Sequence, residues 1–203
     1  MAIRTANNQS LTEITAIPSD ISLGGLVLLE TQTASSDSTI DFTSNIDSTY
    51  DEYIFKYINM HPEEDDKHFM FQADTGTNTS YNQTITSSAF ITYYSEDGTT
   101  GTGVLAYSTP LDQRQGTDFQ ILATGNGYDN DQDACGTLHL FNPSSGTFVK
   151  HWFSESHNNE YRDGSHRQFM AGYFNTTTAI TRVQFKMSSG NIDSGTFKLY
   201  GVT

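Results

Sequence analysis

The stretch Arg182-Val-Gln-Phe-Lys-Met187 alternates strictly between polar and apolar residues, and it decides the fold class of the chain. Successive side chains of a β-strand point to opposite faces, so this alternation predicts one half-buried strand. A second stretch, Thr196-Phe-Lys-Leu-Tyr200, has the same pattern, and residues 188–195 between them have the composition of a loop. We therefore predict an antiparallel hairpin with a long loop. Its inward side chains are Val183, Phe185, Met187, Phe197 and Leu199.

The rest of the chain repeats this signal. Runs rich in β-branched and aromatic residues, separated by turn residues, recur roughly every 8 to 15 residues. They lie at residues 26–30, 39–42, 52–58, 67–72, 90–94, 104–107, 118–123, 137–141, 147–153 and 167–174. No segment from Leu23 onward sustains the 3.6-residue apolar period of an amphipathic helix. The pattern predicts an all-β fold, an antiparallel β-sandwich of the jelly-roll kind.

The composition excludes several classes of protein. The chain has 203 residues, with 10 Lys and Arg against 24 Asp and Glu, which gives a formal net charge of -14. This balance argues against nucleic-acid binding, because phosphate contacts need a basic surface. No apolar run approaches the roughly 18 residues that span a bilayer, and residues 1–20 lack the pattern of a signal peptide. The single cysteine, Cys135, excludes an internal disulfide. The 13 Phe and 11 Tyr supply a core for one domain, predicted over residues 21–203.

Residues 1–20 are polar, with isolated apolar residues and a proline near their end. The pattern predicts an extended N-terminal arm, which either docks on a neighbouring molecule or frays as a free terminus. An arm that orders on a neighbour adds buried apolar area without enlarging the domain. We expect it to serve assembly through Ile3, Leu11, Ile14 and Ile17.

The sequence offers no motif for catalysis. It contains no Gly-x-Ser-x-Gly, no His-Glu-x-x-His and no phosphate-binding glycine-rich loop with a lysine. The many acidic residues allow carboxylate pairs of the kind that cleave glycosides, but only their separation in space selects such a pair. None of the 6 histidines forms a pair with helical metal-binding spacing. We expect a protein that is not an enzyme and that has no catalytic residue, metal or cofactor.

The most acidic loop covers residues 125–136. Asp129, Asp131 and Asp133 alternate along it, which superficially resembles a calcium-binding loop. The glycine at the sixth position of such a loop and its closing glutamate are missing. On an extended chain the three carboxylates would point the same way. We favour a solvated loop between strands and keep the three aspartates as the alternative metal ligands.

Three aromatic residues are candidates for contact with a sugar. Trp152 is the only tryptophan, and Tyr128 and Tyr161 lie in or next to loops. A ring beside Asp and Asn can bind a sugar, because the ring meets C–H groups while the polar side chains bind hydroxyls. The alternative is that the rings fill the core, and we favour that for Trp152. For Tyr128 and Tyr161 both interpretations stay open.

Several long segments of the sequence are distinctive. They include Leu28-Leu-Glu-Thr-Gln-Thr-Ala-Ser-Ser36, Leu138-His-Leu-Phe-Asn-Pro-Ser-Ser145 and Gln184-Phe-Lys-Met-Ser-Ser-Gly-Asn-Ile-Asp193. With residues 1–11, 46–55, 171–176 and 198–201, they resemble a family of small proteins encoded by marine bacteriophages, mostly phages of cyanobacteria and Pelagibacter-like hosts. The resemblance covers nearly the whole chain and is weakest over residues 74–133.

The resemblance implies a role in the virion, because members of the family look like tail-fibre or capsid-attached proteins. It supplies no catalytic residues. We expect a structural protein on the virion surface, made in the bacterial host cytoplasm, whose partners are copies of itself, other virion proteins and the host surface. A polar, acidic surface suits a protein packed at high copy number. The alternative is a carbohydrate-binding, lectin-like module that presents Tyr128, Tyr161 or Trp152 in an open groove.

Overall fold

The computed structural model describes residues 25–98 and 103–203, and nearly all of its regular structure is antiparallel β-strand. Within these residues the only helix is a single 3-10 turn, η2 (Thr109–Leu111). The strands are β1 (Leu26–Asp37), β2 (Ile40–Phe42), β3 (Glu52–Pro62), β4 (Lys67–Thr75), β5 (Ile85–Ser95), β6 (Val104–Tyr107), β7 (Arg114–Gly116), β8 (Gln120–Asn126), β9 (Ala134–Phe141), β10 (Lys150–Glu160), β11 (Gly164–Phe174), β12 (Ile180–Met187) and β13 (Ile192–Val202). The predicted all-β class is confirmed.

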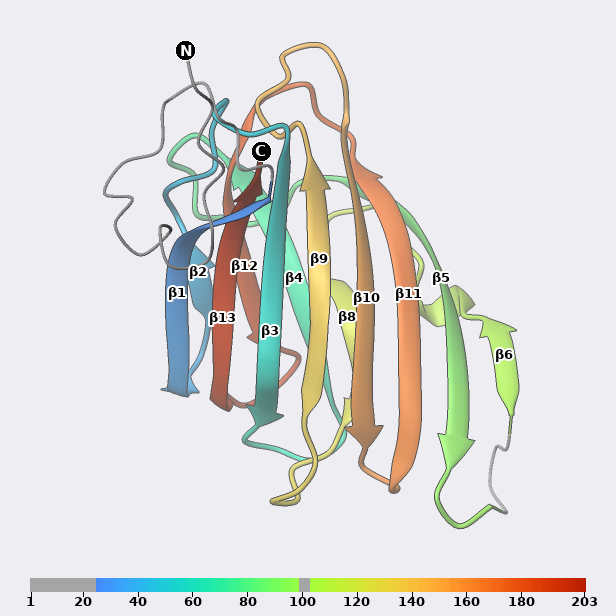
Figure 1. Cartoon of the computed structure of the whole chain (residues 1–203). Helices are drawn as coiled ribbons and strands as arrows, with labels where there is room; N and C mark the ends of the chain where they lie inside the picture. Colours follow the sequence, from blue (N-terminus) through green and yellow to red (C-terminus); the bar gives the residue numbers. More distant parts are fainter. Residues whose placement is uncertain (1–24, 99–102) are drawn as a thin grey trace, which may run out of the picture.

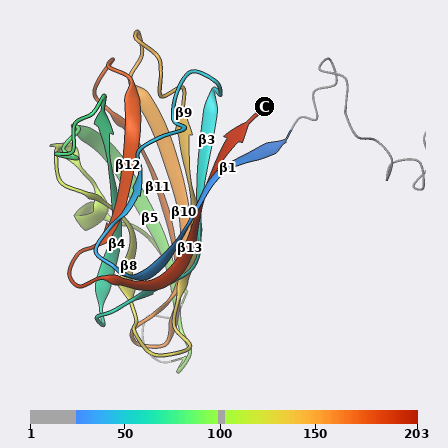
Figure 2. The same ribbon diagram turned by 90° about the vertical axis from the view of Figure 1, so that its left-hand side faces the viewer.

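The strands form two layers that face each other (Figures 1 and 2). The front sheet has the order β1-β13-β3-β9-β10-β11-β5, and both β6 and β7 pair with β5. The back sheet has the order β8-β4-β12-β2. One residue pair, Glu160 of β10 and Asn126 of β8, joins the two sheets. The sandwich therefore approaches a closed barrel.

Eight of the strands have the order of a jelly roll. The front sheet contains β1-β13-β3-β9 and the back sheet contains β2-β12-β4-β8. Along these eight strands the chain changes sheet at every step except the step from β4 to β8, as a jelly roll requires. The remaining strands are two insertions, β5–β7 and β10–β11. Both extend only the front sheet, which is therefore wider than the back sheet.

The two C-terminal strands do not form the predicted hairpin. β12 pairs with β2 and β4 in the back sheet, whereas β13 pairs with β1 and β3 in the front sheet. Residues 188–191 carry the chain from one sheet to the other. The prediction was wrong because alternation fixes which face of a strand is buried but not which strand lies beside it.

The predicted inward faces of these strands are confirmed. All five predicted side chains are buried. Phe185 and Phe197 meet across the core from opposite sheets, with ring centroids 6.0 Å apart. Phe185 also stacks on Phe69 of β4 at 5.6 Å. Aromatic rings therefore occupy the centre of the core, where they gain both apolar burial and ring–ring contact.

The inner side of the β10–β11 insertion is polar. Gln168 Nε2 donates to Asn158 Oδ1 at 2.9 Å, and Asn158 Nδ2 donates to the carbonyl oxygen of Thr124 at 3.0 Å. The backbone N–H of Thr124 donates to Gln168 Oε1 at 2.8 Å. Buried amides are costly unless they are hydrogen-bonded, and these two side chains satisfy each other. The network fixes β8 against the β10–β11 hairpin.

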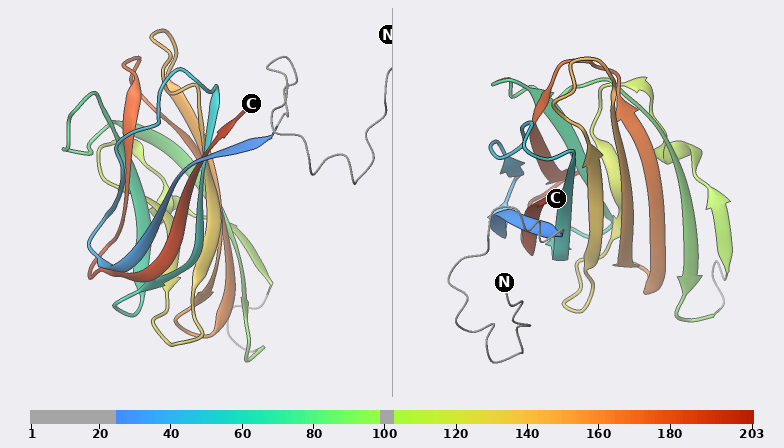
Figure 3. Two further views of the ribbon diagram at one scale, coloured as in Figure 1. Left: turned by 60° about the vertical axis from the view of Figure 1, so that its left-hand side comes forward. Right: turned by 45° about the horizontal axis from the view of Figure 1, so that its top comes forward.

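The start of β1 and the end of β13 project together from the body of the sandwich (Figure 3). Leu26 lies opposite Val202, which also pairs with Glu52 of β3, and Leu26 is exposed. The predicted arm, residues 1–20 with Ile3, Leu11, Ile14 and Ile17, lies outside the described residues. The arm and the domain boundary at residue 21 therefore stay predictions.

Candidate functional site

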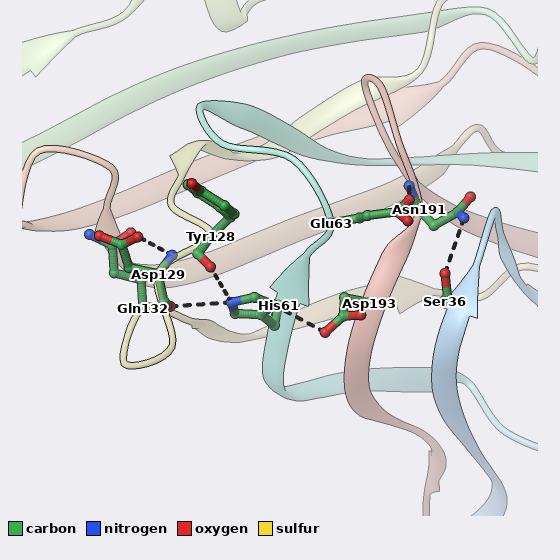
Figure 4. Close-up of polar contacts among 8 residues, drawn as sticks. All are labelled: Ser36, His61, Glu63, Tyr128, Asp129, Gln132, Asn191 and Asp193. Atoms are coloured by element: carbon green, nitrogen blue, oxygen red, sulfur yellow. Dashed lines mark hydrogen bonds and ion pairs between the residues drawn. The ribbon is translucent and has the colours of Figure 1, made fainter.

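The acidic loop between β8 and β9 is a closed turn (Figure 4). The backbone N–H of Gln132 donates to the carbonyl oxygen of Asp129 at 2.9 Å. His61 of β3 anchors the loop, because its Nε2 lies 3.0 Å from the carbonyl oxygen of Tyr128 and 3.2 Å from that of Asp129. Its Nδ1 lies 3.4 Å from Asp193 Oδ2 of β13. The expectation of an extended chain that points three aspartates the same way was wrong, because the turn reverses the backbone direction.

Asp131 and Asp133 border a hollow together with His61 and Asp193, and Asp129 is not part of its lining. In the part of the chain that the structure describes, no group of three or more His, Cys, Asp or Glu side chains is placed to hold a metal ion. Calcium prefers six to eight oxygen ligands, so two loop carboxylates supply too few ligands for a calcium site. The geometry fits a solvated loop.

We expect calcium to leave the stability of the protein unchanged. A ligand that binds only the folded state raises the melting temperature by mass action, so a real site would respond to both excess calcium and EDTA. Scanning calorimetry should give melting temperatures in the two conditions that agree within about 1 °C. Asp131→Asn should behave like the parent chain. A shift of several degrees that this variant abolishes would instead establish a calcium site.

The three aromatic candidates lie in different environments. Trp152 is 2% exposed and packs edge-on against Phe71, with ring centroids 5.1 Å apart. Trp152 therefore belongs to the core, as we favoured from the sequence, and it is no longer a candidate for contact with a sugar. Tyr128 is exposed on the acidic loop. Tyr161 is half-buried in the turn after β10, and the Arg162 guanidinium carbon lies 4.5 Å from its ring centroid.

An aromatic surface covers the outer side of the inserted strands. We define the front face as the outward side chains of the neighbouring strands β9, β10, β11 and β5. His139 stacks on Phe153 at 4.3 Å, and Phe141 lies 5.7 Å from Phe153. Phe90 stacks on Phe169 at 4.7 Å. Phe90 is 46% exposed and Phe153 is 41% exposed. Exposed rings gathered on one face are typical of an interaction site.

Small residues separate the two groups of rings. The strand register places Phe153 opposite Ala171, and Ala171 opposite Ser88. Two shallow hollows share these three residues, and one is bordered by Phe141 and the other by Phe90. Rings beside hollows offer a shape into which a side chain of a partner can insert.

The front face carries no net charge, unlike the chain as a whole. The only charged residues of its four strands are Lys150, Glu155, Glu160 and Arg167. Lys150 and Glu160 are buried, and Glu155 forms an ion pair with Arg167. The excess negative charge of the chain therefore lies outside this face, so net charge does not oppose the approach of two copies across it.

A cleft of about 390 Å³ lies where the front sheet extends past the edge of the back sheet. Ile91 and Tyr93 line it from β5, and Thr124 lines it from β8. The turn after β10 contributes Tyr161 and Arg162. Because the back sheet ends at β8, the inner side of this part of β5 is only half-buried.

Polar groups of several kinds line the cleft. The hydroxyl of Tyr93 donates to Glu160 Oε1 at 2.7 Å, and this hydrogen bond, followed by burial, raises the pKa of Tyr93 to about 12. The ring of His166 stands edge-on to Tyr93, with centroids 5.7 Å apart. Burial, with a smaller effect of His157, lowers the pKa of His166 to about 4, so the ring is neutral at pH 7. Its Nε2 is buried and has no hydrogen-bond partner among the described residues.

The sequence pointed to Tyr161 but not to Tyr93, Glu160 or His166. These residues come from β5, β10 and β11, and only the sheet order brings them together. The sequence patterns did not indicate the front face either, because a strand of a sandwich is expected to carry apolar residues on one side only. The adjacent pair Trp152 and Phe153 was the available signal, since it places large rings on both sides of β10.

No family model matches the chain, and no curated protein or solved structure matches it either. Within residues 25–98 and 103–203, no helix is long and apolar enough to cross a membrane. The front face and the cleft are therefore the features from which we infer a function.

Proposed function

We propose that this chain is a non-enzymatic structural protein of a bacteriophage virion, an outer decoration or appendage of the capsid or tail that also contacts the host surface. The observation that carries the proposal is the front face, where rings are exposed on a surface without net charge in a strongly acidic chain. The jelly-roll order supports it, because this arrangement is frequent in viral capsid proteins and lectins. The sequence resemblance to virion-associated phage proteins supports it too.

The occupant that we propose for the front face is a second copy of the chain. Like-charged copies repel wherever their acidic surfaces approach, so a neutral apolar face is where they can meet. A two-fold contact uses the same surface on both copies. Phe153 of each copy would then insert beside Ala171 of the other, in the hollows that flank this pair.

Phe153→Lys should disperse the oligomer. Burial of one Phe ring stabilises a contact by about 1.5–3 kcal/mol, and two-fold symmetry doubles this to about 3–6 kcal/mol. The dimer dissociation constant should therefore rise by about two to four orders of magnitude. Sedimentation velocity over a range of protein concentrations measures this change. Phe148→Lys is the control, because Phe148 is an even more exposed ring and lies in the loop between β9 and β10.

A wild-type chain that sediments as a monomer at every concentration would contradict the proposed contact, and so would a Phe153→Lys oligomer as tight as the parent. Deletion of residues 2–17 in the same assay tests the predicted arm. We expect an unchanged melting temperature and a weaker oligomer, or weaker retention on purified particles. If the chain is a monomer and is absent from particles, the free carbohydrate-binding module becomes the better proposal.

A further inference from the structure

We propose that the cleft beside Tyr161 binds a neutral saccharide of one or two units. The cleft lies on the inner side of the inserted strands, so it is separate from the front face and does not depend on self-association. Its volume of about 390 Å³ falls within the range of small-ligand pockets.

The lining of the cleft matches the two kinds of surface that a sugar presents. Hydroxyl groups both donate and accept hydrogen bonds, and the C–H faces of the ring are apolar. Glu160 uses Oε1 to accept the Tyr93 hydroxyl, and no described residue donates to Oε2, which is left for a ligand hydroxyl. Arg162 supplies N–H donors at the rim, and Ile91 supplies apolar surface.

The charges of the lining favour a neutral ligand. Asp66 and Glu160 are acidic, and Arg162 is the one Lys or Arg side chain among the described residues that line the cleft. Burial lowers the pKa of both His68 and His166, so neither ring adds positive charge at pH 7. The lining therefore has a net negative charge, which repels phosphate and carboxylate groups.

The cleft is held in shape before any ligand arrives. The backbone N–H of Tyr161 donates to the carbonyl oxygen of Gly125 at 3.0 Å. Gly125 has a φ of 60°, which glycine adopts readily, and a side chain there would approach the Tyr161 ring to 3.5 Å. Thr124, next to it, is fixed by the Asn158–Gln168 network. A pre-organised site loses less conformational entropy when it binds.

Titration of the ¹⁵N-labelled full-length chain tests the proposal. The probes are D-glucose, D-galactose, D-mannose and N-acetylglucosamine, with D-glucuronate as the anionic counterpart. We expect at least one neutral sugar to shift the amide resonances of the cleft residues. Glucuronate should bind at least about tenfold more weakly than that sugar, because of the acidic lining. The absence of cleft shifts with all four neutral sugars would overturn the proposal, and so would glucuronate binding of equal strength.

Two variants assign the binding to the cleft. Tyr161→Ala should weaken binding by about tenfold, and Arg162→Ala should also weaken it. Arg162 is exposed, so its replacement leaves the fold intact if Tyr161→Ala does not fold. Tyr128→Ala is the matched control, because Tyr128 is an exposed tyrosine outside the cleft lining. Binding that neither cleft variant weakens would reject this site.

Different variants test self-association through the front face and saccharide binding in the cleft, so either proposal can fail without the other. Phe153→Lys should keep the sugar-dependent shifts while it disperses the oligomer. Tyr161→Ala should keep the oligomer while it loses the sugar. An oligomer without sugar binding would leave the structural role standing and reject the cleft as a saccharide site.

Discussion

Replacement of Phe185 by alanine should lower the free energy of unfolding by about 3–5 kcal/mol. The ring is fully buried at the centre of the core. Rings from both sheets surround it at centroid distances of up to 6.3 Å, namely Phe42, Phe55, Phe69, Phe71 and Phe197. Because they belong to several strands, a shift of one strand cannot close the cavity that alanine would leave.

Urea unfolding measures this loss, with the fluorescence of the single tryptophan, Trp152, as the signal. Phe148→Ala is the control, because Phe148 is 67% exposed and its loss should change stability by no more than about 0.5 kcal/mol. Phe185→Leu keeps most of the side-chain volume and should lower the free energy of unfolding by less than about 1.5 kcal/mol. This variant replaces Phe185→Ala in the measurement if the alanine variant does not fold. A loss below about 1 kcal/mol for Phe185→Ala would show that the ring does not lie in the core.

Acidification should destabilise the protein through His166, by about 3 kcal/mol between pH 7 and pH 4. The pKa of this ring is about 4 in the folded protein, against 6.5 when it is unperturbed, and burial is the main cause. Between these two values the unfolded chain binds a proton that the folded chain does not. The contribution of His166 to stability is therefore complete above the pKa that this ring has in the unfolded chain, and it falls as the pH decreases toward 4.

Urea unfolding at pH 7 and at pH 4.5 measures the effect. Carboxylates also titrate over this range, so the informative quantity is the difference between the parent chain and His166→Gln. The variant should lose about 2–3 kcal/mol less than the parent on acidification. His151→Gln is the control, because His151 is exposed on the front face and its variant should keep the full loss. Equal losses for the parent and His166→Gln would show that the ring is not held neutral.

The strand positions show where local pattern carries information and where it stops. The run at residues 104–107 coincides with β6. The run at residues 147–153, by contrast, ends seven residues before β10 does, because β10 continues to Glu160. Over that continuation the inward side chains are Ser154, Ser156, Asn158 and Glu160, all buried. A strand that buries hydrogen-bonded polar groups has no apolar alternation to detect.

The sequence by itself determined the all-β class, the strand-forming runs and the buried face of the C-terminal strands. These are local properties, because a period of two residues follows from backbone geometry and the apolar side of that period must leave water. Only the tertiary structure decided that β12 and β13 lie in different sheets, that the insertions widen the front sheet, and that Tyr93 and Glu160 share one cleft with Tyr161. Strand partners are selected by long-range packing and by chain crossings between sheets, and no residue pattern within one strand specifies them.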